Sequence, residues 1–474
     1  ERALKEAKKM RFTAEQCRDQ ALSEAAELRR ENSELKDQLE KTKGQNKKLL
    51  AQLNRDYENS SIPSSQSRNR RKISNNRERT ERKPGAQPGH AHHGRKKQEA
   101  TQTVHLPAPE IVAEDPDFKK TKKIITKQLV SIEMILHVTE YQADVYRNSK
   151  TGEKVHAAFP AGVVDDVNYD GSIKSLLFLL NTDCAVSIDK SQRFLSDLTG
   201  GKLKISRGMI NKLCREFSSK TETERKKIFA DLLSCPVLHT DCTNARVNGE
   251  SAYVFVCASP DEEKVLYFAR EKKGHEGVKG TVTEDFQGIL VHDHEITFYR
   301  YGSAHQECLA HVERYLKDSM ENEPSLTWNR RMRELIQRMI HYRKEHTGEA
   351  SLDPQTIAGF EAEYQEILDK AKEEYKRNEP SPYYREGYNL YRRMQEYKTE
   401  HLLFLHDMRV PTTNNTAERC LRDYKRKQTF AMTFRSLESI EELCHSKGVL
   451  LGVRKNTPNI YTAVMEIFNR RYGA

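Results

Sequence analysis

The chain has 474 residues, of which 36% are hydrophobic and 32% charged, and its net charge is +10. This length exceeds one hydrophobic core, so we expect two to four domains, with much of the chain in extended helices or linkers. No apolar run approaches the roughly 20 residues of a membrane span, and an odd count of nine cysteines without a C-x-x-C pair or signal peptide favours the cytoplasm.

Residues 1–57 are predicted to form a coiled coil, because apolar residues recur every seven positions. The two series are Leu28, Leu35, Thr42, Leu49 and Asn32, Leu39, Asn46, Leu53. With the second series at the a positions, two Asn residues enter the core, which favours a parallel dimer in fixed register. We therefore expect a homodimer or larger assembly joined through this helix. The alternative is a single amphipathic helix packed on its own chain.

Residues 58–100 are predicted to be a basic linker that is disordered when free, because they lack a periodic apolar face. Between Gln66 and Lys97 there are eleven Lys or Arg residues and two Glu residues. Such a local excess of positive charge indicates a polyanionic partner such as DNA. The candidate phosphate-binding cations are Arg68, Arg70, Arg71, Lys72, Arg95, Lys96 and Lys97.

The following two segments are predicted to be small folded regions. Residues 101–165 show strand-like alternation and are expected to form a small β-rich domain. Residues 166–230 are expected to be helical, with a Gly-Gly turn and a helix that begins after Ser206 as N-cap. This is the shape of a helix-turn-helix, with Arg207 as a candidate DNA contact, although such helix pairs are also ordinary packing units.

Residues 231–317 alternate as a mixed sheet does. Three strand-like runs are followed by a short helix near residues 281–286, a fourth strand that ends at Asp293, and another helix. This order predicts the first part of a ribonuclease H-like α/β core. Residues 318–410 are predicted to form a helical insertion within which Trp328 packs, and residues 411–474 complete the core with C-terminal helices.

Three carboxylates in this core are candidate catalytic and metal-binding residues. Asp241 ends the strand-like run Pro236–Cys242, Asp293 ends the run Gly288–Asp293, and Glu418 lies in the first turns of a basic helix. Carboxylate oxygens are the ligands of Mg²⁺, and two such ions can hold both the attacking and the leaving oxygen in phosphoryl transfer. The alternative is that these acids are common structural choices at strand and helix ends.

Several neighbours of these acids have two interpretations. Arg422 and Lys425 share a helix face with Glu418 and could bind phosphate, or Arg422 could form an i,i+4 surface pair. His239 lies two residues before Asp241 and either orients this acid or is a satisfied core residue. Cys308 and His311 form an isolated C-x-x-H, which we interpret as packing rather than as half a zinc site.

Four segments resemble transposases of the insertion sequence 66 family, which are of the DDE type. They are GAQPGH, HTDCTNARVNG, ECLAHVERYLKD and NNTAERCLRDYKRKQ, in the family's order. The resemblance implies a ribonuclease H-like core with Asp241 and Asp293 as metal-binding aspartates and Glu418 as the third acid. It departs at Cys242 and Thr413, where the family usually has acids, and zinc is not expected because residues 143–160 contain no cysteine.

The function predicted from these features is that of a bacterial DNA transposase. It would cut the ends of a mobile element and join them to a target by two-metal phosphoryl transfer, with two Mg²⁺ ions that Mn²⁺ can replace. Its partner would be double-stranded DNA, both element ends and target, at the nucleoid, and a need for accessory proteins stays open. The alternatives are a metal-dependent nuclease or resolvase without strand transfer, and a non-catalytic coiled-coil DNA-binding protein.

Overall fold

The computed structural model describes residues 1–54, 96–380 and 385–470. The chain divides into two compact units, one of residues 1–70, 143–194 and 204–474 and one of residues 71–142 and 195–203. Because residues 55–95 are not among the described residues, most of the predicted basic linker lies outside them. Five of its candidate cations lie there too, namely Arg68, Arg70, Arg71, Lys72 and Arg95.

The smaller unit has little regular structure over its described residues. It contains the short helix α2 (Ile111–Glu114). The two short strands found among the described residues of 101–165, β1 (Val145–Arg147) and β2 (Lys154–His156), belong to the larger unit. Leu129 and Ile132 are 97% and 93% exposed, so none of the described residues covers these two apolar side chains. A β-rich domain over residues 101–165 stays a prediction, and within the described part of this range strand pairing joins residues 145–147 to residues 154–156.

The larger unit is built on a five-stranded sheet with the order β5-β4-β3-β6-β7. Its strands are β3 (Val237–Val247), β4 (Glu250–Ala258), β5 (Val265–Arg270), β6 (Ile289–His292) and β7 (Ala304–Glu307). The first three strands are antiparallel, whereas β6 and β7 run parallel to β3. The expected ribonuclease H-like sheet is confirmed, and β7 is an addition that its short polar sequence did not predict.

The β3–β4 hairpin turns at Asn248 and Gly249, which have φ angles of 49° and 88°. Both values lie in the left-handed region that Asn and Gly tolerate, and a two-residue turn of this kind matches the twist of paired strands. The turn pairs Val247 with Glu250 and thereby sets the register of the whole hairpin.

Helices cover both faces of the sheet. On the face of Ala245 and Val256 lies a core shared with α14 (Asn415–Ala431) and α15 (Leu437–Asn456). On the opposite face, Leu238 and Leu290 pack with Leu232 of α6 (Glu222–Leu233) and with Phe286. Short helical turns connect the strands at α7 (His275–Val278), α8 (Val282–Asp285) and η2 (Ile296–Arg300).

Before α6 and the sheet come α3 (Gly171–Phe178), η1 (Leu179–Asp183), α4 (Ile188–Leu198) and α5 (Arg207–Lys220). Of these, α3, η1 and α5 pack on α15 and α16 at the C-terminal end. Phe178 and Phe217 stack with ring centroids 4.4 Å apart, and both contact Phe468 of α16 (Ile460–Asn469). The Ser206 side chain accepts a hydrogen bond from the Met209 amide at 3.1 Å, so the predicted N-cap is confirmed.

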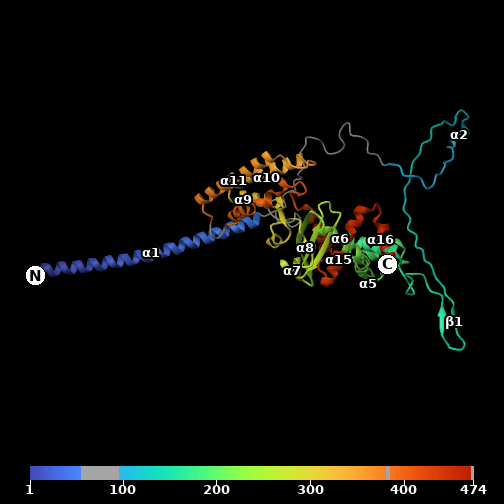
Figure 1. The fold of residues 1–474 in the computed structure, drawn as a ribbon, viewed down its shortest axis with the longest axis horizontal. Helices are drawn as coiled ribbons and strands as arrows, with labels where there is room; N and C mark the ends of the chain where they lie inside the picture. The colour runs from blue at the N-terminus through green and yellow to red at the C-terminus, as the bar shows by residue number, and fades with distance from the viewer. Residues whose placement is uncertain (55–95, 381–384, 471–474) are drawn as a thin grey trace. The chain divides into compact units, whose positions relative to one another are not determined.

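The insertion between the second and third acids is helical, as predicted. It follows α9 (Leu309–Asn322) and consists of α10 (Trp328–Glu345), α11 (Pro354–Arg377), α12 (Glu386–Glu396) and α13 (Lys398–His406). Figure 1 shows α9, α10 and α11 grouped together, and Trp328 is fully buried among them. This core includes Val237 and Val291 of the sheet, so the insertion packs directly against the strands that carry the acids.

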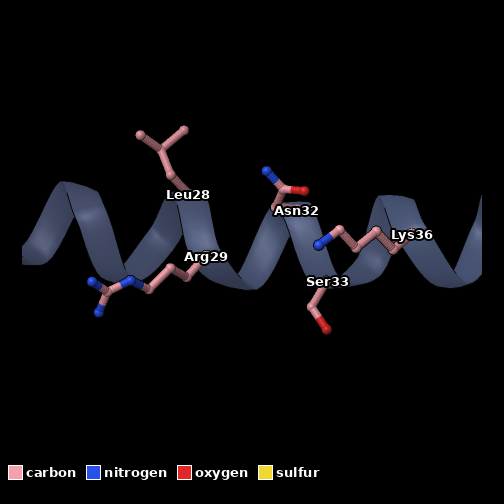
Figure 2. Close-up of a pocket in the computed structure, with 5 residues that line it drawn as sticks. All are labelled: Leu28, Arg29, Asn32, Ser33 and Lys36. Atoms are coloured by element: carbon pink, nitrogen blue, oxygen red, sulfur yellow. The ribbon is translucent and has the colours of Figure 1, made fainter.

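Residues Arg2–Asn54 form the single helix α1. Four of its heptad leucines, at positions 28, 35, 39 and 49, are 54–64% exposed, whereas Gly44 and Ala51 are buried. Figure 2 shows Leu28 and Asn32 on one side of α1 and Arg29 and Ser33 on the other. None of the helices among the described residues is long and apolar enough to cross a membrane.

Candidate active site

The sheet brings Asp241 and Asp293 to neighbouring positions. His239 pairs with Val291 in the parallel β3–β6 ladder, so the same register places Asp241 beside Asp293, two residues further along each chain. Asp293 directly follows β6, as expected. Asp241 does not end its strand, because β3 continues to Val247 as half of the hairpin.

Glu418 reaches this site from the other direction. It lies in the first turn of α14, which packs on the face of β3 that also presents Asp241. One Glu418 oxygen, Oε2, accepts a hydrogen bond from Arg422 at 2.6 Å. The i,i+4 pair considered from the sequence is thus present. The other oxygen of Glu418, Oε1, faces His311.

His311 of α9 lies between the second and third acids. Its Nδ1 is 2.9 Å from Asp293 Oδ1 and 3.9 Å from Glu418 Oε1. Four possible ligand atoms lie within 4.8 Å of one another, one each from Asp293, Cys308, His311 and Glu418. His311 is buried, as the packing interpretation predicts, and in addition it contacts an acid of the site. Sequence spacing could not reveal this, because the helix that carries His311 meets Asp293 only in the folded sheet.

The side chains of this cluster have the chemistry of a cation site. Asp293 Oδ1, Glu418 Oε1 and His311 Nδ1 are all buried, and none makes a hydrogen bond of suitable geometry with another described residue. His311 Nδ1 and Asp293 Oδ1 contact each other at 2.9 Å, whereas Glu418 Oε1 has no such contact, and a buried polar atom without a partner costs about 1–3 kcal/mol. Oxygen and imidazole nitrogen atoms that converge in this way can share a divalent cation, so the donor set fits a metal ion.

The electrostatics lead to the same conclusion. Burial and the neighbouring Asp293 carboxylate raise the pKa of Asp241 well above its usual range, against the effect of the Cys242 amide, which donates to Asp241 Oδ1 at 2.7 Å. Burial alone would lower the pKa of His311, but Asp293 and Cys308 raise it to about 11. The excess negative charge at this point thus retains protons when no cation neutralises it.

A second polar cluster is centred on Glu307 at the end of β7 and includes His294, the residue after Asp293. The Glu307 carboxylate lies 2.7 Å from His294 Nδ1, 3.2 Å from Arg393 and 3.3 Å from His401. Arg393 and His401 belong to α12 and α13, whereas His294 is the residue after Asp293. Glu307 therefore connects the loop of the second acid to the helical insertion.

The candidate DNA-binding cations fall in different places. Lys425 lies on α14 and donates to the Asn244 carbonyl, three residues beyond Asp241. Arg207, at the start of α5, is 70% exposed and pairs with Asp189 at 2.7 Å. Lys96 and Lys97 are exposed in the smaller unit, where Lys97 donates to the Thr126 carbonyl at 2.9 Å.

A ribonuclease H-like sheet with three acids at one site is the architecture of a DDE-type DNA transposase. A family model described as "Transposase IS66 family" matches residues 184–442, which is more than half of the chain. The chain belongs to this family, and it carries a DDE-type transposase domain of a mobile element. No curated protein matches the chain significantly.

Proposed function

We propose that this transposase cleaves the ends of a mobile DNA element and joins their 3′-hydroxyls to target DNA, with Asp241, Asp293 and Glu418 as the catalytic acids. The observation that carries the proposal is the cluster in which Asp293, Glu418 and His311 place buried atoms within 4.8 Å of one another, with Asp241 close enough to interact electrostatically with all three. Family membership implies transposase activity and divalent metals, which supports placing the chemistry at these acids.

Asp241, Asp293 and Glu418 would hold two Mg²⁺ ions, for which Mn²⁺ can substitute, and His311 would add a nitrogen ligand beside Asp293. When bound, such ions activate the attacking oxygen and neutralise charge on the leaving oxygen. The parallel β3–β6 register holds Asp241 and Asp293 side by side. The Arg422–Glu418 bond directs the free oxygen Oε1 of Glu418 toward His311.

The cations would bind DNA around this site. Arg422 is 64% exposed, so its guanidinium can contact a phosphate while it holds Glu418. Arg207, Lys425, the exposed Lys96 and Lys97, and the five linker cations outside the described residues would add contacts that do not read sequence. Such contacts position the duplex, whereas the acids perform the chemistry.

We further propose that two copies associate through α1. Gly44 and Ala51 lie seven residues apart on one buried face, whereas Leu28, Leu35, Leu39 and Leu49 of the heptad face are exposed. A parallel coiled coil would cover these leucines, and it would supply two catalytic domains at high effective concentration to two DNA ends.

The test replaces each acid by its amide, as Asp241→Asn, Asp293→Asn and Glu418→Gln. Each variant should lose Mg²⁺-dependent cleavage of element ends and keep wild-type DNA affinity, because an amide removes a metal ligand and not a fold element. Glu250→Gln, at an exposed position at the start of β4, is the matched control and should cleave normally. Cleavage retained in any acid variant would remove that residue from the site.

A strand-joining assay with a pre-cut, labelled 3′ end separates transposition from hydrolysis. Joined product that depends on all three acids supports the proposal. Cleavage without joining, under conditions that permit assembly of both ends, would favour a hydrolytic nuclease or resolvase.

A further inference from the structure

Asn414 is fully buried at the start of α14, although its neighbour Asn415 is exposed. Burying an amide is unfavourable unless its donors and acceptors are satisfied. The Asn414 side chain does not cap its own helix. Its partners therefore lie elsewhere, and they explain why a polar residue occupies this position.

The side chain of Asn414 makes two hydrogen bonds to β3. Its Nδ2 donates to the Thr240 carbonyl at 2.9 Å, and its Oδ1 lies 2.9 Å from His239 Nδ1. A carbonyl can only accept, so the first bond fixes the orientation of the amide, and His239 must donate through a protonated Nδ1.

The backbone of Asn414 extends the connection to the other two acids. Its N–H donates to Cys308 Sγ at 3.2 Å, and the Cys308 N–H donates to the carbonyl of His292, the residue before Asp293, at 2.9 Å. The Asn414 carbonyl accepts from the Glu418 N–H at 3.1 Å. One residue thus contacts the residue before Asp241, the start of α9 and the backbone of Glu418.

We propose that Asn414 is a positioning residue of the transposase site, which sets the separation between the Glu418 helix and the Asp241 strand. This inference rests on the proposed metal-binding role of the acids. Strand pairing does not reach α14, and the apolar contacts between α14 and the sheet are not directional. Directional bonds from a buried amide set that separation, and misplacement by about 1 Å can cost 100-fold in rate.

The main variant is Asn414→Asp, which keeps the size of the side chain but places a carboxylate oxygen against the Thr240 carbonyl. Asn414→Ala removes both side-chain bonds. Asn415→Asp and Asn415→Ala are the matched controls, since they make the same changes one residue away at an exposed position.

The measurements on the full chain are Mn²⁺ affinity by electron paramagnetic resonance, kcat and KM for end cleavage, and thermal unfolding. Both Asn414 variants should weaken Mn²⁺ binding and lower kcat by about 10- to 100-fold, with KM for DNA unchanged. The Asn415 variants should match the wild type. Wild-type Mn²⁺ affinity and kcat in Asn414→Asp, or equal losses of metal and DNA binding, would overturn the proposal.

A second pair of variants applies if the Asn414 variants unfold. His239→Asn keeps a donor at the position of Nδ1, whereas His239→Leu removes it, so the first should retain more Mn²⁺ affinity. Equal affinities would contradict the positioning role. Asp293→Asn separates the two proposals, because Mn²⁺ binding that survives this change would refute the metal site itself, whatever Asn414 does.

Discussion

Glu307→Gln tests whether the insertion is held to the sheet by a buried charge. Glu307 is 1% exposed, and its partners Arg393 and His401 have side chains 15% and 0% exposed. Removing one member of a buried ion pair typically costs 3–5 kcal/mol, because the other member stays buried without compensation. Arg393 keeps some contact with water, so we expect about 3 kcal/mol, measured by urea unfolding of the full chain.

The matched control is Glu363→Gln, which breaks the pair with Arg338 between α11 and α10. These side chains are 33% and 54% exposed, so its loss should cost about 0–1 kcal/mol. A cost for Glu307→Gln no larger than that of the control would refute the reasoning. It would show that water or rearrangement satisfies Arg393 and His401 without the carboxylate.

The effect of Glu307 should also depend on pH in a defined direction. Burial opposes its ionisation, but His294, His401 and Arg393 lower the pKa of Glu307 below its usual range. A depressed pKa in the folded state contributes stability above the unfolded pKa of about 4.3 and loses it as pH falls through the folded value. The difference in stability between wild type and Glu307→Gln should therefore shrink as pH falls into the acid range.

Three further predictions concern DNA, assembly and metal. Deleting residues 66–97 should flatten the plot of log affinity for DNA against log salt, because eleven cations no longer displace counterions; an unchanged slope would mean that the linker does not touch DNA. Replacing Asn32 and Asn46 with Leu should strengthen association but lower the preference for a dimer over larger oligomers. Sedimentation of the wild-type fragment of residues 14–57 tests the coiled coil, and a monomer at tens of micromolar would contradict it. Because burial and Asp293 raise the pKa of Asp241, a Mg²⁺ ion that binds there must displace a proton. Calorimetry should therefore show that the affinity for Mg²⁺ rises with pH. A Mg²⁺ affinity that does not depend on pH would exclude this displacement.

The local sequence was sufficient to predict the elements that carry the acids. Strand-like runs before Asp241 and Asp293, the Ser206 N-cap and the apolar spacing around Trp328 each depend on residues a few positions apart. Such patterns follow from side-chain periodicity and capping, which act within one helix or strand. The same alternation occurs in residues 101–142, where the described residues form no strand and Leu129 and Ile132 are exposed.

Which residues meet was decided only by the tertiary structure. Asn414 lies 174 residues from Thr240, and His311 reaches Asp293 and Glu418 because the parallel β6 and β7 direct α9 back across the sheet. His311 and Asn414 have no local pattern that separates them from ordinary core residues. Their roles arise from sheet register and helix packing, which depend on the whole chain, since a hydrogen bond between distant residues has no counterpart in sequence spacing.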